Sequence, residues 1–222
     1  MALAVLERLD ADRLREAGAW FAGGTAVSLR CGEFRVSRYV DFLCASMEGY
    51  RELRACVRAD GARGIFVRDV ALLREPRVDR YGIRLALGLG DAVLKLEIVS
   101  EGRISLAGTD DRALPVARLV DDDLVAEKLL ANDDRYLDDS ALGRDAIDLL
   151  MLERTLGALP DAAWTKARTA YGASVDRAWD QSLRRLRARP ELLARALDAM
   201  GVSADARALV AARLASLPDD PA

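Results

Sequence analysis

The sequence predicts an α+β fold: a mixed β-sheet with flanking helices, followed by an α-helical C-terminal region. Before Pro115, short apolar runs bounded by glycine occur between segments of helical periodicity, which is typical of strands interspersed with helices. After Pro115, apolar residues recur at helical spacing almost without interruption. We therefore expect a core of strands and helices over residues 1–115, a helical region over 116–217 and a disordered tail over 218–222.

The elements of the first half follow from apolar spacing and from the positions of glycine. Helical spacing of apolar residues predicts a helix over 2–17 that ends near Gly18. Gly90 and Asp91 separate two strand-like runs and predict a hairpin turn. The strands are expected at 20–22, 38–44, 64–72, 81–89 and 92–100, with further helices at 26–29 and 47–58.

Helix boundaries in the second half are indicated by capping residues, proline and glycine. Asp123 can cap a helix that runs to residue 132, and another helix is expected over 142–156. The remaining helical pattern is divided by Pro160, Pro190 and Gly201. These boundaries predict a layer of several helices.

Composition narrows the classes of function. The 222 residues contain no histidine, which excludes Ser-His-Asp and Cys-His catalysis and histidine-ligated metals. The 3 cysteines lack paired spacing and indicate reduced thiols rather than a disulfide framework or a zinc site. No apolar stretch is long enough to cross a bilayer, and the N-terminus lacks a signal-peptide pattern, so we expect a cytoplasmic protein with no membrane contact. Any catalysis must use carboxylates, lysine, arginine or tyrosine.

A glycine pair precedes a short helical segment near the N-terminus. A turn at Gly23, Gly24 and Thr25 would leave backbone N–H groups unpaired at the start of a helix, where they bind phosphate oxygens. The same pair is also an ordinary tight bend. On the next strand, positions 39 and 41 point to one face because side chains alternate. Carboxylates there would hold magnesium against a triphosphate and help to deprotonate an attacking hydroxyl.

Two stretches of the sequence resemble a known family. They are FAGGTAVSLRCGEFRVSRYVDFLCAS, from Phe21 to Ser46, and EKLLANDDRYLDDSALGRDAIDLLML, from Glu127 to Leu152. In this order they resemble the AbiEii/AbiGii-type nucleotidyltransferases of the polymerase-β-like nucleotidyltransferase superfamily. That family includes toxins of toxin–antitoxin and phage-defence systems. The resemblance covers most of residues 20–155.

The resemblance implies a function and a set of site residues. The chain would transfer a nucleotide from a nucleoside triphosphate to an RNA hydroxyl, such as a tRNA 3′ end, or to a protein hydroxyl. It would have an antitoxin protein as a partner, Mg²⁺ as its cofactor, and a helical region that completes the active site. The implied nucleotide-binding residues are Gly23, Gly24, Thr25, Ser37 and Lys128, and the implied catalytic residues are Asp41, Lys128 and Asp148.

One residue departs from the family's pattern. In the family, the strand after the glycines carries two metal-binding aspartates; Asp41 matches the second, whereas Tyr39 stands in the place of the first. A neutral phenol, with a pKa of about 10, is a poor magnesium ligand. Two hypotheses therefore stay open: an active nucleotidyltransferase, or a catalytically impaired module that binds nucleotide or RNA.

The remaining candidates each have an ordinary structural explanation as well. Glu97 would join Asp41 as a metal ligand, or it would lie with Lys95 on the solvated face of a hairpin strand. Lys128 would contact phosphate, or it would be an exposed helix lysine. Arg144 and Asp148 are four residues apart on a predicted helix and would pair with each other.

Overall fold

The computed structural model describes residues 1–218, which divide into two compact units. The first unit consists of Met1–Ala26 and Ser37–Leu124. The second consists of Val27–Val36 and the described residues from Val125 onward. The disordered tail expected at 218–222 lies, apart from Pro218, outside the described residues.

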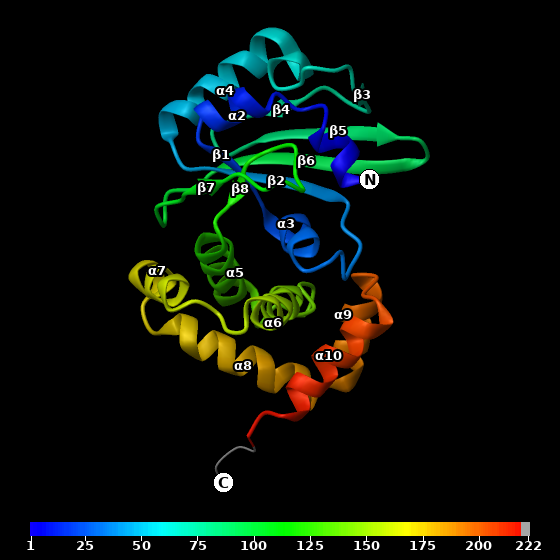
Figure 1. The fold of residues 1–222 in the computed structure, drawn as a ribbon, viewed down its shortest axis with the longest axis vertical. Coiled ribbons are helices and arrows are strands. Elements are labelled where there is room, and N and C mark those ends of the chain that lie inside the picture. Colours follow the sequence, from blue (N-terminus) through cyan, green and yellow to red (C-terminus); the bar gives the residue numbers. More distant parts are fainter. Residues whose placement is uncertain (219–222) are drawn as a thin grey trace. The chain divides into compact units, whose positions relative to one another are not determined.

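A mixed β-sheet forms the centre of the first unit (Figure 1). The strand order is β3-β5-β6-β2-β1-β8-β7, and β4 pairs with β5. β2 is parallel to β6 and β1 is parallel to β8, whereas the other pairs are antiparallel. The predicted mixed sheet is confirmed. The strands are β1 (Ala19–Ala22), β2 (Tyr39–Cys44), β3 (Ala71–Leu72), β4 (Arg77–Val78), β5 (Ile83–Leu89), β6 (Ala92–Ser100), β7 (Gly108–Thr109) and β8 (Arg118–Leu119).

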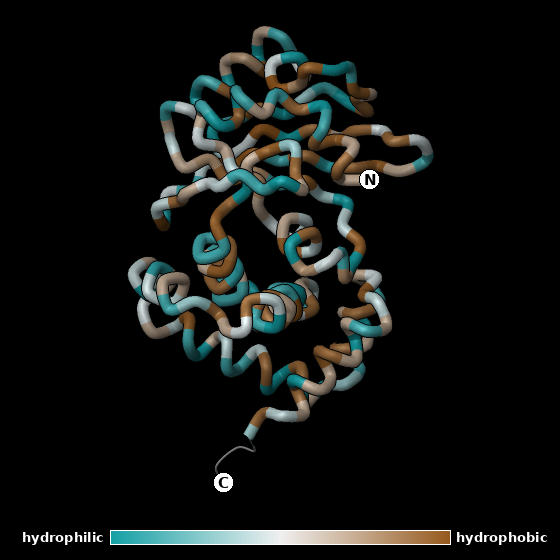
Figure 2. Tube along the Cα trace, viewed as in Figure 1, coloured by the Kyte–Doolittle hydropathy of each residue, from teal (hydrophilic) through white to brown (hydrophobic). Residues whose placement is uncertain are grey.

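The two faces of this sheet differ in character. Figure 1 shows α2 (Ala11–Glu16) and α4 (Met47–Asp60) on one side of the sheet. Val40, Phe42 and Cys44 alternate along β2 and are buried, and Cys44 Sγ lies 3.1 Å from the carbonyl of Ala17 at the end of α2. Figure 2 shows mostly hydrophobic colour along β5 and β6 and hydrophilic colour at the turn between them. Side chains of the intervening positions point to the opposite face, which carries the polar residues of the strands. The polar face is therefore the candidate location of a functional site.

The predicted helix over 2–17 is wrong, because the chain there forms two short helices. α1 (Ala2–Leu6) ends before a turn, and α2 begins after Asp10, whose side chain accepts a hydrogen bond of 3.0 Å from the Arg13 amide. Such a cap starts a new helix and interrupts the old one. Leu9, between them, forms a β-bridge with Phe66.

The predicted strand over 64–72 is also wrong. Its first residue belongs to a 3₁₀ turn, η1 (Gly61–Gly64), and only its end forms a strand, β3. Ile65 and Phe66 are buried. The backbone there bonds to the N-terminal segment rather than to a neighbouring strand, through Ile65 O to the Asp10 amide at 2.9 Å and Val67 N to the Arg8 carbonyl at 2.9 Å. Those tertiary bonds replace the sheet ladder that the apolar run suggested.

The second unit is helical, as predicted. Three helices begin near the predicted boundaries: after Pro160, at Pro190 and after Gly201. The predicted cap at Asp123 is wrong, because α5 begins at Asp121 and contains Asp123 in its first turn. The loop 31–36 is hydrogen-bonded into this unit, through Val36 N to Met200 O at 3.1 Å and Ser203 N to Phe34 O at 2.9 Å. The helices that lie wholly or partly in this unit are α3 (Gly23–Arg30), α5 (Asp121–Arg135), α6 (Arg144–Leu156), α7 (Asp161–Tyr171), α8 (Ser174–Ala188), α9 (Pro190–Ala199) and α10 (Ala204–Ala215).

The helices were also compared with the length and hydropathy of membrane-spanning helices. None of the helices in residues 1–218 combines the length and the apolar character that a bilayer crossing requires.

Candidate functional site

The glycine-threonine segment forms the first turn of α3. The helix begins at Gly23, so the prediction of a turn at Gly23, Gly24 and Thr25 followed by a helix from residue 26 is wrong. Instead, the Thr25 hydroxyl bonds to the Tyr39 carbonyl and lies 2.6 Å from the Ser37 hydroxyl. Thr25 thus ties the start of the helix to the start of β2. The amides of this first turn have no partner within the helix, which is what an anion site requires.

Gly23 is held against Asp41. Its neighbour Ala22 pairs with Asp41 in the antiparallel ladder between β1 and β2. Gly23 has a φ of 71°, and a Cβ added to it would lie 2.2 Å from Asp41 Oδ2. Only glycine therefore satisfies both the backbone conformation and the space beside this carboxylate.

Replacing Gly23 with alanine is expected to displace the Asp41 carboxylate and to lower the free energy of unfolding. The left-handed backbone alone costs about 1 to 2 kcal/mol for a residue with a side chain, and the clash adds to this cost. Gly90→Ala is the matched control, because Gly90 has a φ of 58° and nothing within 4 Å of its added Cβ. Thermal unfolding of both variants measures the difference. Equal losses would show that the space beside Asp41 does not matter.

Asp41 and Glu97 are neighbours on the polar face of the sheet. They are register partners in the parallel pair of β2 and β6. Glu97 also faces Arg84 across the antiparallel pair of β5 and β6, and its Oε1 lies 2.6 Å from Arg84 Nε. Two residues before Asp41 on the same face of β2, Tyr39 is paired in register with Lys95. A row of charged and polar side chains thus crosses the central strands.

The two carboxylates fit one divalent ion better than two. Magnesium is commonly held by one or two carboxylates together with substrate phosphates and water, and Asp41 and Glu97 provide that number from adjacent strands. No group of three or more metal-ligating carboxylates, cysteines or histidines occurs within residues 1–218. Glu97 would exchange its contact with Arg84 to bind such an ion. The donor set therefore suits an ion that takes the rest of its ligands from the substrate.

Lys128 and Asp148 lie together in the second unit, within a cluster of five charges that is mostly buried, with Arg135 at its exposed edge. The Lys128 ammonium is 2.7 Å from Asp148 Oδ2 and 3.1 Å from Asp145 Oδ1. Arg35 forms two bonds with Asp148, of 2.7 and 3.0 Å, and Arg135 approaches Asp145 to 2.6 Å. The Asp148 side chain is 1% exposed and that of Lys128 is 11% exposed. We call these five residues the buried charge cluster.

The charges of the cluster offset the cost of burial. Burial acts to lower the pKa of the Lys128 ammonium, but the charges of Asp148 and Asp145 outweigh it, so this pKa lies above its ordinary value. Burial acts to raise the pKa of Asp145, and the charges of Lys128 and Arg135 outweigh it, so that pKa is lowered. Both groups are held in their charged forms.

Two expectations about this region are corrected. Lys128 is not an exposed helix lysine, because it is buried between two carboxylates. Asp148 pairs with Arg35 and Lys128, whereas the Arg144 guanidinium donates to the Ala141 carbonyl. Sequence reasoning also missed Arg35. Its only signal is its place between the glycines and Ser37 in the first of the two motifs.

The lowered pKa of Asp145 predicts a specific pH dependence. The unfolded carboxyl has a pKa of about 3.9, so the stabilisation from Asp145 is fully present above that value and is lost as the pH falls through the lower, folded pKa. At pH 7, Asp145→Asn is expected to lose about 3 kcal/mol of unfolding free energy. The difference between wild type and variant should shrink below about pH 4. Denaturant unfolding at pH 3 and pH 7 measures it, and a constant difference would contradict the assignment.

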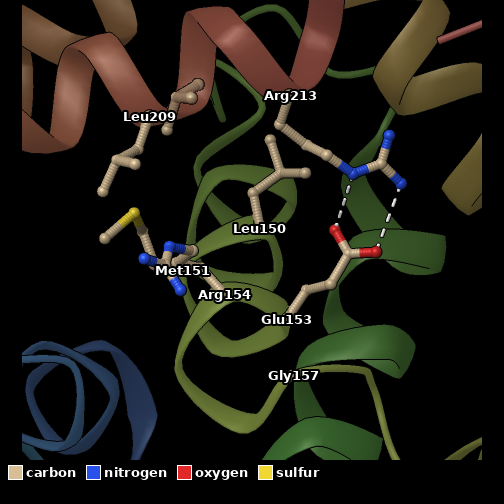
Figure 3. A pocket seen from close by; sticks show the side chains of 8 residues that line it. Leu150, Met151, Glu153, Arg154, Gly157, Leu209 and Arg213 are labelled. Carbon is tan, nitrogen blue, oxygen red and sulfur yellow. Dashed lines mark hydrogen bonds and ion pairs between the residues drawn. The ribbon is translucent and has the colours of Figure 1, made fainter. Parts of the chain in front are cut away.

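A cavity of about 290 Å³ in the second unit is separate from these residues (Figure 3). In Figure 3 a Glu153–Arg213 ion pair lies on one side of it, with bonds of 3.0 and 3.2 Å. None of the predicted site residues lines it, so we do not place the function there. The lining residues are Leu150, Met151, Glu153, Arg154, Gly157, Leu209, Val210 and Arg213.

A mixed sheet with a glycine-rich helix start beside two carboxylates has the features expected of a nucleotidyltransferase. The family model for the nucleotidyl transferase AbiEii toxin of type IV toxin–antitoxin systems matches residues 4–221. The chain belongs to this family. It is therefore a nucleotidyltransferase of the toxin type, and the family resemblance of the two sequence motifs is confirmed.

Two crystal structures from Helicobacter pylori are similar to the chain. One, described as a candidate nucleotidyltransferase, has 14% identity and a TM-score of 0.34, covering 82% of this chain and 94% of its own. The other, JHP933, has 14% identity and a TM-score of 0.35, covering 86% of this chain and 95% of its own. At these scores the likeness adds nothing to the family assignment. A search of curated proteins found no match.

Proposed function

We propose that the chain transfers a nucleotide from a nucleoside triphosphate to an RNA hydroxyl, such as a tRNA 3′ end, with Mg²⁺ as the divalent metal. The observation that carries this proposal is the position of Asp41. It lies against Gly23 at the start of α3 and in register with Glu97 on the adjacent strand. The amides that we propose to bind phosphate are thus neighbours of the carboxylates that we propose to hold the metal ion, and this proximity supports phosphoryl transfer.

Each side chain has a proposed role in this reaction. The amides of Gly23, Gly24 and Thr25 bind phosphate oxygens, and the Thr25 hydroxyl and Ser37 fix the start of β2 beside them. Asp41 and Glu97 would hold Mg²⁺, which when bound neutralises charge on the phosphates. Asp41 also accepts the proton of the attacking hydroxyl.

Two residues of the buried charge cluster have proposed roles as well. Lys128 would bind a phosphate oxygen by exchanging one of its two carboxylate contacts, and Asp148 would orient that ammonium. Asp148 is already engaged by Arg35, so orientation suits it better than proton transfer.

A label-transfer assay tests the proposal. Purified protein and Mg²⁺ are incubated with each of the four nucleoside triphosphates, labelled on the α-phosphate, and with total RNA, purified tRNA or a protein mixture in separate reactions. Label is expected on tRNA, and removal of the 3′-terminal hydroxyl by periodate oxidation should abolish it. Label on protein alone would replace the RNA acceptor with a protein hydroxyl. Label on no acceptor would contradict the proposal.

Tyr39 favours a second candidate function, a nucleotide- or RNA-binding module with impaired turnover. The side chain is 46% exposed at the place where a carboxylate would extend the metal site, and a neutral phenol binds magnesium poorly. This hypothesis predicts nucleotide binding without transfer. Tyr39→Asp should then create transfer activity, whereas an unchanged rate would show that Tyr39 is not the cause of the impairment.

Family membership also bears on the partner of the chain and on its location in the cell. A type IV toxin–antitoxin family implies an antitoxin partner. We place both proteins in the cytoplasm, where tRNA and nucleoside triphosphates are available. Fractionation of cells that express the chain would test this location.

A further inference from the structure

Lys95 lies beside Tyr39 on the polar face of the sheet. The two residues are register partners in the parallel pair of β6 and β2. The Lys95 ammonium is 3.4 Å from the Tyr39 hydroxyl and 5.2 Å from the centroid of its ring. Tyr39 thus holds this cation by a hydrogen bond and by a cation–π contact. The next pair on the same face of these two strands, two residues further along, is Asp41 and Glu97.

The ordinary explanation for a strand lysine is an ion pair with a neighbouring acid. Glu97 is the obvious partner, two residues away on the same face, but it pairs with Arg84 at 2.6 Å instead. Within residues 1–218, Lys95 forms no salt bridge. Its contacts leave the positive charge without a compensating carboxylate.

The location of Lys95 in the sheet favours a role in ligand binding. β6 lies between β5 and β2 and is not an edge strand, so its lysine does not serve to protect a sheet edge. Lys95 and Tyr39 are nevertheless exposed. Lys95 is a cation on an exposed part of the sheet, two residues along the strands from the pair of carboxylates. That position suits the binding of an anion that is also bound to a metal ion.

We propose that Lys95 binds a phosphate group of the nucleoside triphosphate beside Asp41, so that the site needs one divalent ion rather than two. This proposal rests on the proposed function. The ammonium offers three hydrogen-bond donors and one positive charge, and Tyr39 directs it by accepting one of those bonds. Tyr39 is then a positioning residue for a cation, rather than a lost metal ligand.

Binding of inorganic triphosphate in the presence of EDTA tests the role of Lys95 directly. Calorimetry is expected to show that the wild-type protein binds triphosphate. The dissociation constant should rise by about tenfold to a hundredfold in Lys95→Met, because this variant loses a charge-assisted hydrogen bond. Lys95→Arg should retain most of the affinity. Lys166→Met, on α7, removes the same charge at another place and should bind like wild type. Equal affinity of Lys95→Met and wild type would overturn the proposal.

A count of bound metal gives a second readout. Electron paramagnetic resonance of Mn²⁺ is expected to show one ion for each bound nucleotide in wild type, and two in Tyr39→Asp/Lys95→Ser, which exchanges the cation for a carboxylate. Two ions in wild type would overturn the proposal. The proposed function fails differently: triphosphate binding that depends on Lys95, without label transfer to any acceptor, would refute the transferase reaction and leave Lys95 as a phosphate ligand.

Discussion

Replacing Asp41 with alanine is expected to lower nucleotide transfer by about 100-fold or more. Asp41 is the carboxylate that contacts the start of α3 and pairs in register with Glu97. A bound metal ion contributes several kcal/mol to transition-state stabilisation in phosphoryl transfer, and each 1.4 kcal/mol corresponds to about tenfold in rate. The initial rate of label transfer at saturating nucleotide measures this loss.

Two variants separate a catalytic effect from a folding effect. Asp41→Asn keeps the shape of the side chain beside Gly23 but removes its charge, and it should lose nearly as much activity as Asp41→Ala. Glu52→Ala removes one acid from the exposed side of α4 and should transfer at the wild-type rate. Asp41→Asn with wild-type activity would show that the carboxylate neither holds a metal ion nor accepts a proton.

Glu97 is expected to matter less than Asp41, because its contact with Arg84 competes with a metal ion. Glu97→Gln should raise the Mg²⁺ concentration needed for half-maximal rate by about tenfold, as loss of one ligand from a weak site implies. A titration of the rate with Mg²⁺ measures the change. An unchanged midpoint would remove Glu97 from the metal site.

Local patterns were sufficient to predict much of the first unit. Alternation along β2 placed Tyr39 and Asp41 on one face, and the hairpin of β5 and β6 followed from Gly90 and Asp91. These features depend on neighbours in sequence. The pairing of Asp41 with Glu97 does not, since a parallel register across 56 positions is fixed only by the assembled sheet.

The wrong predictions for residues 2–17 and 64–72 and the missed Arg35 have a common physical cause, which is contact between residues far apart in sequence. The N-terminal helix is interrupted because Asp10 caps α2 and Leu9 pairs with Phe66, and the same pairing draws residues 65–67 away from the sheet. Helical periodicity continues through such a break, so apolar spacing cannot reveal it. Arg35 was missed for a similar reason: it is separated from Asp148 by 113 positions, and only the fold makes them neighbours.

The buried charge cluster should be the most sensitive part of the second unit to substitution. Asp148→Ala is expected to lower the free energy of unfolding by about 3 to 5 kcal/mol, because Arg35 and Lys128 would lose their shared carboxylate in a buried place. Asp145 would then be the one carboxylate left in a cluster with three cations, and it contacts two of them, Lys128 and Arg135. Denaturant unfolding with a probe in the helical unit measures the loss.

Lys128→Met is the informative companion to Asp148→Ala. It removes one cation but leaves Arg35 paired with Asp148 and Arg135 paired with Asp145, while the methionine occupies much of the volume of the lysine stem. The cluster is then neutral, and the free energy of unfolding should change by less than about 1 kcal/mol. Lys128→Met can therefore be assayed as a folded protein. If it also transfers nucleotide at the wild-type rate, Lys128 has no role in transfer. If it folds normally but loses transfer, the ammonium acts on the nucleotide.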